Sequence, residues 1–347
     1  MTDNSIYDHM HTNSVPLETI SEGYVKNVSF ISLRIALVSF FRTAITLDKY
    51  MNDVSVLTDM TQDKKDKNLG VAYAHEAYNA VFHYQNFMEL AIKEIRYELT
   101  NDEKIYEKTF VENLDNLVAG IDDGTVPEKY HFIKEHYYDI RAINKLRNES
   151  VHSGVYILRC EALNELFGKY ALPLMMEISR LPLFSGILYW KYNLDNTKVH
   201  PIEDIIEEYK KGSVDEYKIQ LLKHIAAAAF DNEIYITKQE LQQAQPDIFQ
   251  THPGFLYELL FAKRVKKAEK EAQELSELDQ MDAHVCPVCQ NKTLVLEQEY
   301  VDDENDKCYK YTYRVHCTQC GFKLDHYLIN KINQTGVAIE DYSKYHS

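Results

Sequence analysis

The sequence predicts a mainly α-helical protein, with an up-and-down helical bundle, a helical middle region and a small C-terminal β element. Two observations predict this fold class. Glycine and proline are scarce, with 11 and 8 in 347 residues, which argues against a turn-rich all-β fold. Apolar residues also recur at three- and four-residue spacing through most of the chain, as on one face of a helix. The 45% hydrophobic content supplies ample material for a core.

Residues 21–185 are predicted to form the bundle, after a polar and loosely ordered N-terminus at 1–20. Helical spacing is kept in five segments: residues 22–50, 84–99 beyond the polar break at 61–68, 103–118, 128–150 and 156–180. The fourth segment ends at the stop signal Ser153-Gly154. The fifth contains Pro173, which lacks a backbone N–H and should therefore kink the helix.

Residues 186–282 are predicted to be a helical middle region that is less regular than the bundle. Its clearest helices lie at 202–211, 215–230 and 252–278. The last of them carries five basic residues within eight positions: Lys263, Arg264, Lys266, Lys267 and Lys270. We favour a solvated helix with charges of both signs over a strip that follows nucleic-acid phosphates.

The charge balance limits the partners, because 54 acidic residues against 38 basic ones give a net charge of −16. The global field repels a polyanion such as RNA, which would have to be held by a local basic site. The N-terminus lacks the basic and apolar regions of a signal peptide. Arg34 and Arg42, within the most apolar stretch at 28–47, argue against a membrane span. We therefore expect a cytoplasmic protein with no membrane partner.

Four of the six cysteines form two CxxC pairs near the C-terminus, Cys286 with Cys289 and Cys317 with Cys320. In a chain without a secretion signal, this pattern indicates metal binding in a reducing compartment. Each pair can turn two thiolates toward one ion, and two pairs complete the tetrahedral ligand set of structural Zn²⁺. Such a zinc ion has no open coordination position and would not be catalytic.

Segments 293–300 and 308–316 predict two strands, which an acidic turn at 302–306 would join so that the cysteine pairs meet. Together with those pairs, the region resembles a zinc ribbon, and we assign residues 283–347 to the ribbon and a C-terminal tail. Cys308 is either a strand residue or a competing ligand.

Aromatic and basic residues alternate along the second predicted strand, with Tyr309, Tyr311 and Tyr313 on one face and Lys310 and Arg314 on the other. A row of tyrosines can stack unpaired bases, or it can pack against other parts of a protein. We prefer packing or a protein interface.

The helix predicted to end near residue 150 carries an arginine on the face that should be buried. Its apolar stripe consists of Ile133, Tyr137, Ile140 and Ile143, and Arg147 falls inside this stripe because it follows Ile143 by four positions. A guanidinium on a buried face requires an explanation. His152 lies five residues further on and can converge with Arg147 only where the helix loosens near its end.

The run from Arg147 to His152 matches an R-x4-H pattern, and the segment resembles the HEPN-domain ribonucleases over roughly residues 70–185. The polar Asn148 directly after the arginine also fits. Glu89, on an earlier helix, is similar to the polar or acidic residue that faces the motif in that family. The resemblance implies an HEPN-like bundle that cleaves RNA without a metal. In that reaction the ribose 2′-OH attacks the adjacent phosphate and leaves a 2′,3′-cyclic phosphate and a 5′-hydroxyl.

The resemblance also implies a role for each residue. His152 would transfer protons near neutral pH, and Arg147 would neutralise the charge of the phosphorane. Asn148 would orient the pair or hold a phosphate oxygen, and Glu89 would fix the guanidinium. One motif supplies a single histidine, whereas the reaction needs an acid and a base. We therefore expect a symmetric homodimer with two motifs across one cleft.

Two interpretations follow. The first is an endoribonuclease of prokaryotic anti-phage defence or of a toxin system, acting on RNA with tRNA among the candidates. In it, the ribbon contributes target binding, dimer stability or sensing. The second is a non-catalytic interaction or regulatory protein, in which Arg147 forms a salt bridge with Glu89 or Glu149 and His152 caps the helix. The resemblance favours the first interpretation, and the acidic net charge favours the second.

Overall fold

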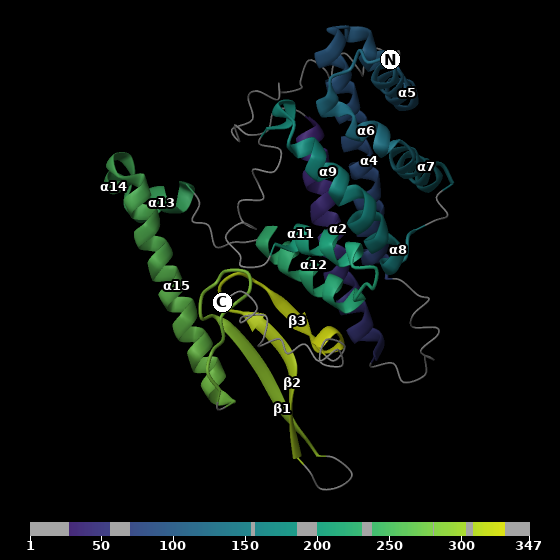
Figure 1. Ribbon diagram of the computed structural model, residues 1–347. Helices are drawn as coiled ribbons and strands as arrows, with labels where there is room; N and C mark the ends of the chain where they lie inside the picture. Colours follow the sequence, from purple (N-terminus) through teal and green to yellow (C-terminus); the bar gives the residue numbers. More distant parts are fainter. Residues whose placement is uncertain are drawn as a thin grey trace, which may run out of the picture. The chain divides into compact units, whose positions relative to one another are not determined.

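The computed structural model describes residues 28–55, 70–153, 157–185, 200–230, 238–279, 281–302 and 308–329 (Figure 1). The N-terminus at 1–20, the polar break at 61–68 and most of the acidic turn at 302–306 lie outside the described residues. Within helices and strands, the side chains at 150–153 and 308–311 are also outside the description.

The prediction of a mainly helical protein with a small C-terminal β element is confirmed. The α-helices are α2 (Val28–Ser55), α4 (Val71–Thr100), α5 (Phe110–Asp122), α6 (Phe132–Glu135), α7 (Tyr137–Ser153), α8 (Cys160–Glu165), α9 (Leu172–Ser179), α11 (Pro201–Lys210), α12 (Glu216–Phe230), α13 (Lys238–Ala244), α14 (Pro246–Thr251) and α15 (Pro253–Leu278). Shorter turns are η2 (Glu103–Glu107), η3 (Glu128–Tyr130), η4 (Leu166–Ala171) and η5 (Pro182–Phe184).

The chain divides into two compact units, and the division passes through α2, α4 and α9. The first unit comprises Met1–Leu37, Tyr78–Tyr156 and Leu174–Tyr189. The second comprises Val38–Ala77, Ile157–Pro173 and Trp190–Ser347.

The core of the first unit follows the helical spacing of the sequence. On α4, the predicted stripe of Tyr84, Phe87, Met88, Ala91, Ile92, Ile95 and Leu99 is buried up to Ile95, and Leu99 near the helix end is half-buried. Helix α5 begins at a capping box, in which Thr109 and Glu112 each accept a hydrogen bond from the backbone N–H of the other. On α7, Ile140 and Ile143 are buried as the stripe predicts, and Tyr137 is half-buried.

The expected continuous helix over 128–150 is divided in the structure. The turn η3 and the short helix α6 precede α7, and the break falls at His136, whose φ of −95° and ψ of 12° leave the helical region. The His136 Nδ1 lies 3.1 Å from the Asp139 carboxylate at the start of α7. This local side-chain contact stabilises a new helix start in place of continuation.

The expected kink near Pro173 takes the form of a π-helical turn. The segment η4 is a π-helix, and the Leu172 N–H donates to the Phe167 carbonyl five residues earlier. Pro173 has no N–H to continue the regular ladder, so the turn before it widens. Within this turn, Gly168 gives room to the Tyr209 ring, because a Cβ atom there would lie 2.2 Å from it.

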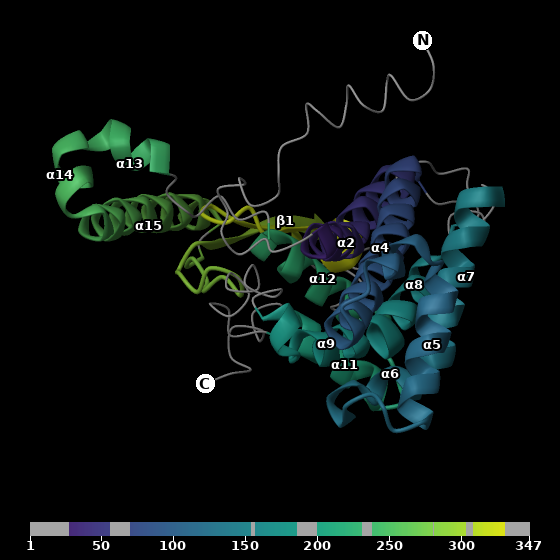
Figure 2. The ribbon, with the colours of Figure 1, turned by 90° about the horizontal axis from the view of Figure 1, so that it is seen from above.

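The second unit joins the C-terminal half of α2 to α8, α11, α12, α13, α14, α15 and the sheet. The Phe40 and Phe167 rings stack at 4.2 Å between centroids, and α11 packs against α12. Helices α13 and α14 lie beside the start of α15, where Leu241 and Leu256 are buried together (Figure 2). Further along α15, Ala272 packs against Val295 of the sheet.

The sheet has three antiparallel strands in the order β1 (Leu294–Asp302), β2 (Cys308–Cys317) and β3 (Lys323–Asp325). The two predicted strands are present, and β3 is an addition that its short sequence did not reveal. A register shift between Glu297 and Gln298 leaves Tyr313 unpaired as a β-bulge. The bulge interrupts the two-residue alternation on which the expected row of tyrosines depended.

Helix α2 contains the stretch Val28–Met51, which is long and apolar enough to cross a membrane. Within the described protein, however, 61% of its most apolar window is buried. Leu33, Leu37 and Phe41 are fully covered, as in a core helix of a folded protein.

Candidate active site and metal centre

The four cysteines of the two CxxC pairs converge at one point of the second unit. Their Sγ atoms all lie within 4.8 Å of one another, and three of the four side chains are buried. The Cys286 and Cys320 sulfurs are 3.5 Å apart, and those of Cys289 and Cys317 are 3.7 Å apart. A tetrahedral zinc ion with bonds of about 2.3 Å places its sulfurs about 3.8 Å apart, so this cluster could hold a metal ion such as zinc.

Local backbone geometry turns each cysteine pair toward the same point. The Val288 N–H points at the Cys286 sulfur (3.4 Å). The Gln319 and Cys320 N–H groups point at the Cys317 sulfur (3.3 and 3.4 Å). Each pair is followed by a residue with positive φ, Gln290 at 61° and Gly321 at 71°. The positive φ values turn the chain back after each pair. The N–H groups that point at the sulfurs favour the thiolate form, which a metal ligand requires.

One contact at the metal centre was not predicted from the sequence. Thr293 is fully buried, and its hydroxyl lies 3.2 Å from the Cys289 sulfur and 3.1 Å from the Cys317 sulfur. It thereby links ligands from the two pairs. The sequence places Thr293 shortly after the first cysteine pair, but a threonine before a strand is common and does not by itself predict a contact with the cysteine sulfurs.

The described tyrosine and arginine side chains of β2 contact acidic side chains of the sheet. The Tyr313 hydroxyl donates to Glu297 (2.9 Å), and the Arg314 guanidinium lies near Glu297 and Asp325 (3.7 and 3.8 Å). The side chains of Tyr309, Lys310 and Tyr311, and that of Cys308, lie outside the described residues.

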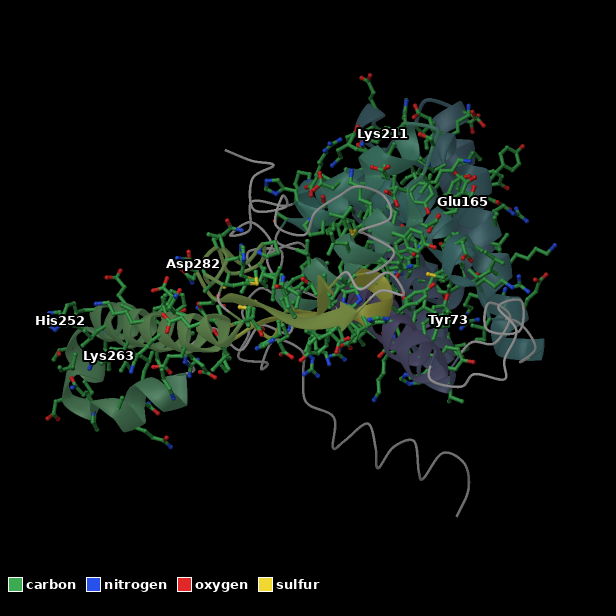
Figure 3. All side chains as sticks on the ribbon, turned by 90° about the horizontal axis from the view of Figure 1, so that it is seen from below. Tyr73, Glu165, Lys211, His252, Lys263 and Asp282 are labelled. Atoms are coloured by element: carbon green, nitrogen blue, oxygen red, sulfur yellow. The ribbon has the colours of Figure 1, made fainter. Side chains whose placement is uncertain are left out.

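The lysines of α15 are exposed, and Lys270 pairs with Glu274 (3.3 Å). Figure 3 shows Lys263 on this helix. Ala268 and Ala272 are buried on the opposite side of α15. This distribution is that of a solvated helix with one packed side.

Arg147 lies on α7 of the first unit and is half-buried. Its guanidinium carbon stands 5.1 Å from the centre of the Phe82 ring, and its Nη1 donates to the Asn148 side chain (2.9 Å). The Nε atom is buried and has no hydrogen-bond partner. Among the described residues, no carboxylate forms an ion pair with this guanidinium. It is therefore a positioned cation, and only its Nη groups, not the buried Nε, can reach a ligand.

The structure brings together only some of the other predicted site residues. Asn148 contacts Arg147 as stated, but Glu89 on α4 pairs with Lys93 (2.8 Å) instead of Arg147. Glu149 lies near Lys145 (3.8 Å). His152 belongs to the last turn of α7, which stays helical through Ser153, so the loosening that was expected to bring His152 toward Arg147 is not present before Gly154. The His152 side chain lies outside the described residues.

Residues of α4 complete the surroundings of Arg147, and sequence reasoning did not single them out. Phe82 supports the guanidinium, and the Gln85 amide donates to Asn144 of α7 (3.0 Å), which ties the two helices together. His83 meets the Phe82 ring edge-on at 5.2 Å, and burial lowers its pKa below the ordinary value. The sequence signal for these contacts was the cluster of aromatic and polar residues on α4 next to its apolar stripe.

A second cation was also missed, in the core of the second unit. The Lys223 ammonium is fully buried, donates to Asn164 (2.8 Å) and stands 4.5 Å from the centre of the Phe40 ring. Asn164 in turn donates to Glu216 (2.8 Å). Burial lowers the pKa of Lys223 to about 8. A lysine within the apolar helix α12 was a signal of this polar core.

Another polar pair of the second unit connects α2 and α12 with the ribbon. The Asp48 carboxylate accepts hydrogen bonds from the backbone N–H groups of Asp325 and Leu328 (both 3.3 Å). His224 lies 3.7 Å from the same carboxylate. A pocket of about 360 Å³ next to His224 is also lined by Cys320, Gly321 and Lys323. The segment that carries the sheet and the four cysteines is thus packed onto helices of its own unit.

Comparison with known proteins gives no match, whether with family models, curated proteins or solved structures.

Proposed function

We propose that this protein is a metal-independent endoribonuclease of HEPN type, in which Arg147 and His152 act on the scissile phosphate of RNA. The observation that carries the proposal is the state of Arg147. Its guanidinium is held by Phe82 and Asn148 and has no carboxylate partner among the described residues. The Nε atom is buried, so a phosphate would be bound by the Nη groups. A structural arginine is normally neutralised by an acid, whereas a phosphate-binding one must remain available.

The chemistry follows from the two side chains. The fixed guanidinium would donate two N–H bonds to the phosphorane oxygens and so stabilise the charge that develops there. The His152 imidazole would remove the proton from the ribose 2′-OH, and a protonated imidazole would deliver one to the departing 5′-oxygen. Asn148 would keep the guanidinium in position. The Glu89 carboxylate pairs with Lys93 (2.8 Å), and the proposal assigns it no part in fixing the arginine.

The second imidazole would come from a second copy of the chain. In a homodimer with two motifs across one cleft, each site receives an arginine and a histidine from each subunit. Mixing wild-type and His152→Ala proteins under subunit exchange tests this arrangement. The mixed dimer keeps only one imidazole in the shared cleft and should be nearly as inactive as His152→Ala. A mixed dimer with about half of the wild-type rate would contradict the composite site.

Zinc would have a structural role in this proposal. Four cysteine ligands leave no open position for substrate or water, and the cluster belongs to the unit that does not contain Arg147. Replacement of Cys286 by serine should release the metal, measured by elemental analysis, and lower the thermal stability of the second unit. Loss of RNA cleavage when a chelator is added in excess over the metal, with the protein still folded, would argue for a catalytic metal.

RNA cleavage by wild-type and His152→Ala proteins, purified in parallel and assayed in EDTA, tests the main proposal. We expect cleavage by the wild type and at least a hundredfold loss in the variant. Equal cleavage by both would indicate a contaminating nuclease. The outcome would then favour a non-catalytic interaction protein, the function that the net charge of −16 suits better.

A further inference from the structure

Two aromatic side chains of α4 form a short ladder beside Arg147. Tyr78 and Phe82 lie one helical turn apart, with ring centres separated by 5.8 Å and planes only 11° from parallel. Both rings are half-buried, so neither is sealed in the core. Arg147 stands over the Phe82 ring at 5.1 Å. An aromatic pair thus leads to the proposed phosphate-binding cation.

The ladder is held in place by its neighbours. His83 packs edge-on against Phe82, with the planes at 85° and the centres 5.2 Å apart. The hydrogen bond between Gln85 and Asn144 fixes α4 against α7 three residues beyond Phe82. Fixed rings lose little conformational entropy when a flat ligand stacks on them.

We propose that Tyr78 and Phe82 form a stacking platform for one unpaired base of single-stranded RNA, so that the neighbouring phosphate reaches Arg147. The inference rests on the proposed function and adds the substrate class. Every base presents a π-face, and stacking on an aromatic side chain is tolerant of sequence. Bases in a duplex are already stacked on one another, so the platform selects unpaired RNA.

The platform also explains how an acidic protein binds a polyanion. With a net charge of −16, the protein cannot rely on a general electrostatic attraction for RNA. Stacking supplies affinity that does not depend on charge, and a single guanidinium then needs to contact only one phosphate. RNA binding should accordingly fall only slightly between low and physiological salt, because few counterions are released.

Binding of a single-stranded RNA oligonucleotide that contains 2-aminopurine tests the platform. The His152→Ala protein is the background, so that binding is measured without cleavage. We expect quenching of the 2-aminopurine fluorescence on binding, and affinity that is about ten- to hundredfold weaker in Tyr78→Ala. Tyr78→Phe should retain the affinity, because it keeps the ring.

Tyr138→Ala is the matched control, because Tyr138 is also a tyrosine of the first unit, lies on α7 and is 82% exposed. It should bind RNA like the background protein. Equal affinity of Tyr78→Ala and the background, or equal binding of a fully paired RNA, would overturn the platform. The two proposals can fail separately: wild-type protein without RNase activity but with Tyr78-dependent binding would refute only the nuclease.

Discussion

Arg147 in the first unit and Lys223 in the second are two cations with the same kind of neighbours. Each stands over a phenylalanine ring, Phe82 or Phe40, and each donates to an asparagine side chain at 2.8–2.9 Å. They differ in exposure, because Lys223 is fully buried and Arg147 is only half-buried. Similar contacts therefore surround a sealed cation in one unit and an accessible cation in the other.

The difference separates a structural role from a proposed functional one. Lys223 is joined through Asn164 to Glu216, and burial lowers its pKa to about 8, so that it lies close to losing its charge. Arg147 has no acidic partner among the residues that the structure describes, and its side chain is only half-buried, although the Nε atom itself is closed off. Burial, and not the identity of the contacts, decides which cation can meet a ligand.

The largest expected effect is on RNA cleavage by Arg147→Ala. Loss of a positioned donor at the developing charge should slow cleavage about 10²- to 10³-fold. Lys223→Met, the matched change in the buried cation, should leave the rate of the folded protein within a fewfold of the wild type. Single-turnover assays of both variants would measure this, and similar losses in both would remove the distinction.

The next effect is on the pH dependence of stability. Because the pKa of Lys223 is lowered to about 8 in the folded protein, the unfolded chain binds more protons between pH 8 and about 10.5. The free energy of unfolding of the wild type should therefore rise relative to Lys223→Met over this range, by up to about 3 kcal/mol. Urea unfolding of the two proteins at several pH values measures this difference in the free energy of unfolding. A difference that does not change with pH would contradict the lowered pKa of Lys223.

The two asparagines provide a smaller, paired test. Asn164→Ala leaves the buried Lys223 without its acceptor and should lower the free energy of unfolding by about 1–3 kcal/mol. Asn148→Ala, at the half-buried cation, should leave stability nearly unchanged and slow RNA cleavage about tenfold. Chemical denaturation and cleavage assays on both variants measure this. A stability loss in Asn148→Ala as large as that in Asn164→Ala would contradict the expected difference.

The smallest effects are expected from the two phenylalanines. Phe82→Leu removes the ring beneath Arg147 and should slow cleavage by about three- to tenfold. Phe40→Leu removes the ring beneath Lys223 and its stacking on Phe167, and should cost about 1 kcal/mol of stability. A stability loss in Phe82→Leu without any kinetic effect would indicate that Phe82 is only a packing residue.

The convergence of the four cysteines was predictable because its determinants are local. Two residues between cysteines fix the separation of the thiols, and a hairpin between the pairs brings them together. The helical stripes of α4 and α7 were predictable for the same reason, since periodicity reports burial directly. The bulge at Tyr313 and the break at His136 depend on single backbone conformations that periodicity does not encode.

The surroundings of Arg147 were predictable only in part. Asn148 is adjacent in sequence, and its contact with Arg147 could be expected. Phe82 comes from another helix, so its place beneath the guanidinium depends on how α4 and α7 pack. The same limit applies to Glu89, because sequence similarity to a position cannot show that Lys93, four residues further on, will take the carboxylate.

The most direct test of the central claim is the chemistry of the RNA ends produced in excess EDTA. If Arg147 stabilises the charge on the attacked phosphate, the wild type should leave 2′,3′-cyclic phosphate and 5′-hydroxyl ends, and Arg147→Ala should leave almost none. Ends with a 3′-hydroxyl and a 5′-phosphate, or cleavage that appears only when Mg²⁺ is added, would contradict it.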